Sequence, residues 1–160
     1  MSPIFFSASW AGDVGHALDA GPDQETLEGK LPEYWEFYQL VRSKYQSSWA
    51  LGVRDLPAEL GSGTRYLWVA WGEGRVTDCR IVDGPEAFDA TYVLAADYED
   101  WKALHQGYDA LRTVMYRKLL LEDGDLLEFF KGIYFFVESL ELIAKVPTSF
   151  PADARVSAPA

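Results

Sequence analysis

The chain has 160 residues, 49% of them hydrophobic and 15% aromatic, which fits one domain with a single core. No stretch reaches the roughly 18 consecutive apolar residues that cross a bilayer, so we expect no integral membrane association. The net charge of −11 disfavours nucleic acid as a partner, because an acidic chain repels phosphate backbones.

The first residues disfavour a secreted protein, and the cysteine content disfavours a protein held together by disulfides or by a cysteine-rich zinc site. Met1–Trp10 contains Phe5 and Phe6 but no basic region and only a short apolar run, unlike a secretory signal. We therefore expect a cytoplasmic protein. Cys79 is the only cysteine, which excludes an internal disulfide and a cysteine-rich zinc site.

The N-terminal part is predicted to be helical. Ser7 or Ser9 can cap a short helix that ends near Leu18, and the Ala-Gly-Pro-Asp sequence that follows breaks it. A second helix is predicted over Pro32–Tyr45, because proline suits a first helical turn and aromatic residues recur there at three- and four-residue spacings.

The middle of the chain changes to the two-residue period of strands. Alternating apolar residues predict a strand over 49–53. Tyr66–Trp71 and Arg75–Val82 flank a Gly-Glu-Gly loop and are predicted to form a hairpin. Asp89–Ala96 is predicted to be the fourth strand.

Helices return after the fourth strand. Asp97 with Asp100 resembles a capping box, which predicts a helix over Tyr98–Gln106 that Gly107 ends. Another short helix is expected over Ala110–Lys118.

The C-terminal part is predicted as an edge strand over Leu119–Glu122, an Asp-Gly-Asp turn, and one long helix over 125–146 that Pro147 ends. We expect a single domain over 1–147, with N-terminal helices in 1–46 and the core in 47–147. The residues 148–160 are expected to be a flexible tail.

The last predicted helix is unusually apolar. One broad arc of a helical wheel holds Leu126, Phe129, Phe130, Ile133, Phe136, Val137, Leu140 and Ile143. Tyr134, Phe135 and Leu142 nevertheless fall among the charged positions. An ordinary core helix, a lid over a ligand cavity and a dimer face all remain open.

No convincing catalytic or metal-binding pattern is found. His16 and His105 are the only histidines, and neither has the spacing of metal ligands. Asp123 and Asp125 flank Gly124 without the ligand series of a calcium loop, so turn and capping roles are favoured. We therefore expect neither an enzyme nor a bound metal or cofactor.

The order of elements over Trp49–Val146 resembles the sterol carrier protein type two family. Strands ending in T-Y-V-L-A-A-D precede Y-E-D-W-K-A-L-H-Q-G, a helix, a strand L-L-L-E, the turn D-G-D and an apolar last helix. The positions that match the family's pattern are Asp97, Trp101, Leu104, Gly107, Gly124 and Asp125. In that family a glycine often separates the second helix from the short strand, whereas residues 115–119 contain none.

The resemblance implies an α+β fold. It implies a five-stranded, mostly antiparallel sheet, helices on one face, and a hydrophobic tunnel that takes fatty acids, sterols or other lipids without catalysis. Large apolar residues from the predicted elements would form its walls. The candidate ligand-binding residues are Trp68, Ala70, Trp101, Leu104, Met115, Phe129, Ile133, Phe136 and Val137.

Two alternatives compete with binding, and possible transfer, of an apolar ligand. The first is a protein-interaction or homodimerisation module that uses Tyr134, Phe135 and Leu142, or the helix that begins at Pro32, around a filled core. The second is a small hydrolase or isomerase that uses Asp97, His105 or Asp125, although a base and nucleophile pair is missing.

Overall fold

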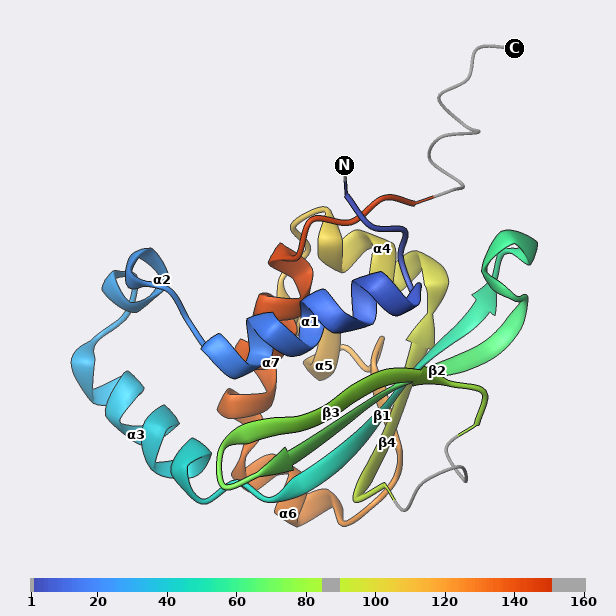
Figure 1. The fold of residues 1–160 in the computed structure, drawn as a ribbon. Coiled ribbons are helices and arrows are strands. Elements are labelled where there is room, and N and C mark those ends of the chain that lie inside the picture. Colours follow the sequence, from blue (N-terminus) through green and yellow to red (C-terminus); the bar gives the residue numbers. More distant parts are fainter. Residues whose placement is uncertain (1, 85–89, 151–160) are drawn as a thin grey trace.

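The computed structural model describes residues 2–84 and 90–150. Its centre is an open five-stranded sheet in the order β3-β2-β1-β4-β5 (Figure 1). Only β1 and β4 pair in parallel, and the other pairs are antiparallel. The predicted α+β class and the mostly antiparallel sheet are confirmed. The strands are β1 Ser47–Leu56, β2 Gly63–Gly72, β3 Arg75–Val82, β4 Tyr92–Asp97 and β5 Leu120–Asp123.

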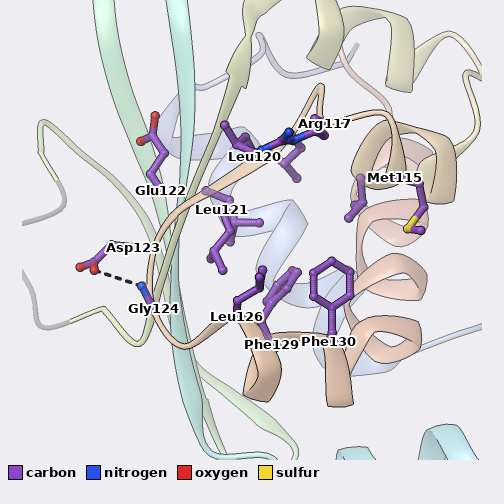
Figure 2. A pocket seen from close by; sticks show the side chains of 13 residues that line it. Met115, Arg117, Leu120, Leu121, Glu122, Asp123, Gly124, Leu126, Phe129 and Phe130 are labelled. Atoms are coloured by element: carbon purple, nitrogen blue, oxygen red, sulfur yellow. Dashed lines mark hydrogen bonds between the residues drawn. The ribbon is translucent and has the colours of Figure 1, made fainter.

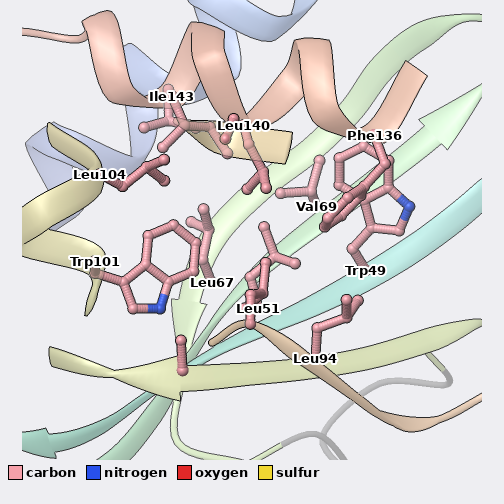
Figure 3. Packing of buried hydrophobic residues seen from close by; sticks show 14 of the residues in the cluster. Trp49, Leu51, Leu67, Val69, Leu94, Trp101, Leu104, Phe136, Leu140 and Ile143 are labelled. Carbon is pink, nitrogen blue, oxygen red and sulfur yellow. The ribbon is translucent and has the colours of Figure 1, made fainter. Parts of the chain in front are cut away.

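The helices pack on one face of this sheet, and the core lies between the two layers (Figures 1 and 3). Leu51, Leu67 and Leu94 point from the strands toward Leu140 and Ile143 of the last helix. The helices are α1 Ala8–Ala20, α2 Gln24–Glu28, α3 Pro32–Ser43, α4 Tyr98–His105, α5 Ala110–Met115, α6 Leu126–Lys131 and α7 Ile133–Lys145, with a short 3-10 turn at Ala58–Leu60.

Capping explains where two helices begin. The Ser7 hydroxyl accepts a hydrogen bond from the backbone of Trp10 at 3.2 Å, as predicted for the start of α1. Asp125 likewise accepts from the backbone of Glu128 at the start of α6. The capping box at Asp97 was wrong, because this carboxylate does not cap α4 and instead pairs with Arg54 at 3.1 Å.

The long final helix was also wrong, because it is two helices separated at Gly132. The backbone there has φ −106° and ψ 22°, outside the helical region. The bare α-carbon of Gly132 faces Val41 and Tyr45, at ordinary contact distance for an added methyl group. The side chains on the two sides of this break therefore do not follow one helical wheel: Phe130 before it is exposed, whereas Phe135 after it is buried.

The ordered core extends beyond the predicted boundary at 147. Ile4 and Ser149 form a parallel β-bridge, in which the Phe5 N–H donates to the Ser149 carbonyl at 2.9 Å. The ring of Phe150 is buried and stacks on Phe5, with 5.0 Å between the ring centroids. Residues 148–150 are therefore part of the domain, and the remainder of the predicted tail, 151–160, lies outside the described residues.

Candidate ligand cavity

A cavity of about 550 Å³ lies beside the edge of the sheet, between β5, α5 and α6 (Figure 2). This volume is within the range of about 300–1,000 Å³ that is usual for small-molecule sites. Nine of its thirteen lining residues are apolar. They are Leu94, Val114, Met115, Leu119, Leu120, Leu121, Leu126, Phe129 and Phe130, and the other four are Arg117, Glu122, Asp123 and Gly124.

The wall formed by β5 depends on the turn that follows it. Leu121 pairs with Leu94 of β4, which fixes the strand at the sheet edge. Gly124 then turns the chain into α6 with φ 120°, a conformation that favours glycine. A Cβ at this position would lie 2.7 Å from the Thr91 carbonyl oxygen, so glycine is also required by space.

The cavity has a buried interior and an exposed apolar rim. Phe129 is buried, and its ring centroid lies 4.9 Å from that of Phe136 and 5.3 Å from that of Tyr92. Met115 and Leu126 are each 56% exposed at the rim. Exposed apolar side chains beside an apolar cavity are typical of a site that accepts an apolar partner.

The charged groups of the lining differ in their partners. Glu122 faces the guanidinium of Arg54 at 3.7 Å, and the Asp123 carboxylate accepts from the Gly124 backbone N–H at 3.0 Å. Arg117 forms no salt bridge with any carboxylate of the described residues. The lining therefore contains one cation whose charge is not neutralised by a neighbour.

The whole fold is similar to solved structures of one kind. The crystal structure of sterol carrier protein 2 matches with a TM-score of 0.69 and 20% identity, over 89% of this chain and 98% of that one. The chain has a sterol carrier protein 2-like fold. The solution structure of a conserved hypothetical protein from Thermus thermophilus matches with a TM-score of 0.67 and 20% identity, over 93% and 94% of the two chains. No family model and no curated protein matches the sequence.

In this sterol carrier protein 2-like domain, the nine predicted ligand-binding residues do not gather in one place. Met115 and Phe129 line the cavity. Phe136 and Val137 are buried in the adjoining core, and Ile133 is partly buried against it. Their role as ligand contacts stays a prediction.

The other four predicted residues lie away from the cavity. The side chains of Trp68 and Ala70 lie on the opposite face of β2 from Leu67 and Val69, which point into the core. The Trp101 indole donates to the Gly52 carbonyl at 3.0 Å, and both Trp101 and Leu104 belong to the core under α4.

Sequence reasoning missed Leu121, Leu126, Phe130 and Arg117 as cavity residues. The L-L-L-E strand and the D-G-D turn were recognised as elements, but an edge strand gives no sequence signal of a cavity beside it. Leu126 and Phe130 were assigned to the interior by a continuous helical wheel, which the break at Gly132 invalidates.

The residues considered for catalysis are separated in this domain. Asp97 and His105 stand at opposite ends of α4, which spans about 12 Å at 1.5 Å per residue. Asp125 caps α6. His105 is surrounded by the rings of Phe5, Trp10 and Phe150. Burial lowers the pKa of its imidazole to about 4, which a weak contact with the backbone of Ala144 opposes.

The described residues contain neither a metal-binding cluster nor a membrane-spanning helix. Within 2–84 and 90–150, no group of three or more histidine, cysteine, aspartate or glutamate side chains could hold a metal ion. None of the helices described is long and apolar enough to span a membrane.

Proposed function

We propose that the protein binds an apolar small molecule, such as a fatty acid, a sterol or another lipid, in the cavity between β5, α5 and α6. The observation that carries this proposal is a 550 Å³ space lined mainly by leucine and phenylalanine, open at an apolar rim. Transfer of the ligand between donors and acceptors is a further part of the proposal. The likeness of fold to sterol carrier protein 2 supports it.

The apolar lining can contribute much of the free energy of binding. Burial of a methylene group contributes about 0.8 kcal/mol, so eight to ten buried methylenes contribute roughly 6–8 kcal/mol. Part of this offsets the lost freedom of the ligand, so micromolar binding, which needs about 8 kcal/mol net, requires a longer buried chain or added polar contacts.

Native mass spectrometry of freshly purified protein tests the proposal directly. We expect an adduct with the mass of a lipid, which organic extraction then releases for identification. A protein free of adduct that also takes up no fluorescent fatty acid saturably would overturn the proposal.

A cavity-filling variant connects binding to this particular space. Leu121→Trp adds bulk within the lining and should reduce fatty acid uptake at least about 10-fold, which corresponds to about 1.4 kcal/mol. Leu111→Trp makes the same change on α5 at an exposed position that is not in the lining, and it should bind as the wild type does. Equal binding by both variants would place the ligand elsewhere.

The proposed function is binding without catalysis. It is supported by the separation of Asp97, His105 and Asp125 and by the apolar surroundings of His105. A turnover that fell on His105→Ala substitution while ligand affinity was retained would contradict it.

A second candidate is self-association through α3. Phe37 and Leu40 of this helix are exposed, as is the neighbouring Tyr134, whose ring centroid lies 5.8 Å from that of Tyr34. The earlier candidate Phe135 is buried and cannot contribute. Sedimentation should detect a dimer, and the double substitution of Phe37 and Leu40 by serine should dissociate it. Monomers at all concentrations would exclude a homodimer.

A further inference from the structure

The backbone of Arg117 adopts a conformation that arginine rarely adopts. This residue follows α5 and has φ 62°, in the left-handed region that favours glycine. A non-glycine residue there is strained, and such strain is often found at functional positions. Its side chain lines the cavity and is exposed. The chain therefore places a guanidinium at the cavity where glycine would fit the backbone better.

The surroundings of Arg117 leave its charge available. The next residue, Lys118, already faces the Asp100 carboxylate at 3.7 Å, and Glu122 faces Arg54. No carboxylate of residues 2–84 or 90–150 forms a salt bridge with Arg117. In Figure 2 the side chain of Arg117 lies beside Leu120, at the opposite end of the lining from Phe129 and Phe130. One end of the cavity is thus cationic and the other is aromatic.

We propose that Arg117 makes this cavity selective for an amphiphile with a monoanionic head group, a carboxylate on an apolar chain. The guanidinium binds the carboxylate through paired N–H donors, and the apolar chain of the ligand lies toward Phe129. Arg117 is the one cation among the lining residues and neutralises a single negative charge, whereas the carboxylates of Glu122 and Asp123 point away from the cavity (Figure 2). A dianionic phosphate monoester would bring a second charge without a partner, so it binds less well. The inference rests on the proposed function and specifies the ligand class for that site.

Calorimetry of the full chain at pH 8 with two ligands of equal length measures this selectivity. Dodecanoate is ionised at this pH and dodecanol is neutral. We expect dodecanoate to bind about 10-fold or more tightly than dodecanol, because hydrogen bonds to charged groups are stronger than those between neutral groups. Dodecyl phosphate should bind less tightly than dodecanoate, and tighter binding of the phosphate would overturn the monoanion assignment.

Arg117→Gln should lower the affinity for dodecanoate much more than the affinity for dodecanol, and so remove the preference for dodecanoate. Arg112→Gln is the matched control, because Arg112 is an exposed arginine of α5 outside the lining and should keep the wild-type preference. Equal affinity of the wild type for dodecanoate and dodecanol would overturn this inference and leave the proposed function intact. Binding of neither ligand would contradict the proposed function itself.

Arg117→Gly separates a ligand role from a structural role. Glycine relieves the left-handed strain, so this variant should unfold at a higher temperature than the wild type while it loses the preference for dodecanoate. A less stable Arg117→Gly variant that kept its preference for dodecanoate would show that the arginine serves the fold, and would overturn the inference.

Discussion

The hydroxyl of Tyr34 donates a 2.5 Å hydrogen bond to the carboxylate of Glu138, which is buried in α7. The ammonium of Lys30 also binds this carboxylate and lies 4.5 Å from the centre of the Tyr34 ring. The buried Glu138 thereby links the start of α3 to the middle of α7. The α3 helix holds its position through this contact as well as through apolar packing.

Substitution of Tyr34 by phenylalanine should lower the free energy of unfolding by about 1–2 kcal/mol, because a buried carboxylate loses one hydrogen bond. Urea denaturation monitored by tryptophan fluorescence measures the change. Tyr134→Phe is the matched control, since Tyr134 is exposed, and it should be close to neutral. Equal effects of the two substitutions would show that the hydrogen bond is not important for stability.

Stability should decrease as the pH falls from 6.5 toward 4 because of His105. Its pKa is about 4 in the folded protein and 6.5 as the ordinary value, so in this window the unfolded chain binds a proton that the folded chain does not. The loss is at most about 3 kcal/mol over the window. His105→Phe should make the dependence of unfolding free energy on pH shallower there; an unchanged slope would contradict the buried neutral imidazole.

Two glycines with left-handed backbones should respond differently to alanine. Gly124→Ala should lower the free energy of unfolding by about 2–4 kcal/mol, because the added Cβ clashes with the Thr91 carbonyl and the backbone is also strained. Gly107→Ala should cost about 1–2 kcal/mol, since φ is 105° but no atom lies within 4 Å of the added group. Thermal unfolding of both variants gives the order, and the reverse order would be inconsistent with the turn after β5.

Phe135 and Tyr134 are neighbours in sequence with opposite environments. Phe135 packs against Trp71 and Tyr45, with ring centroids 5.0 and 4.5 Å apart, so Phe135→Ala should cost about 3–5 kcal/mol. Tyr134→Ala should cost less than about 1 kcal/mol. Chemical denaturation distinguishes them, and similar losses would mean that the direction of α7 differs from that described.

Local signals were sufficient to predict most elements of the fold. The Arg75–Val82 strand, the Gly-Glu-Gly loop and the Ser7 cap follow from period and turn chemistry, and the structure confirms all three. The break at Gly132 could not be predicted, because an isolated glycine within an apolar helical pattern is often tolerated. The helix α2 was missed because it has only five residues, too few to show a period.

The candidate site was less predictable than the fold. Phe129 and Met115 were identified because large apolar residues line cavities as well as cores. Trp68 was predicted to line the cavity and lies on the face of β2 opposite to Leu67, since alternation along a strand separates two faces without showing which one is covered by helices. Arg117 could not be recognised, because its left-handed backbone is a property of the folded chain.

The pairing of Ile4 with Ser149 has a practical consequence for attaching the protein to a surface, a dye or a fusion partner. It brings the first and last described segments together at one end of the molecule, whereas α6 and the cavity rim beside it lie at the other (Figure 1). A fusion partner, fluorophore or surface tether attached beside residues 4 or 149 therefore starts from the end of the molecule opposite the opening. Protein that is immobilised through this end should therefore keep the cavity rim accessible to ligand.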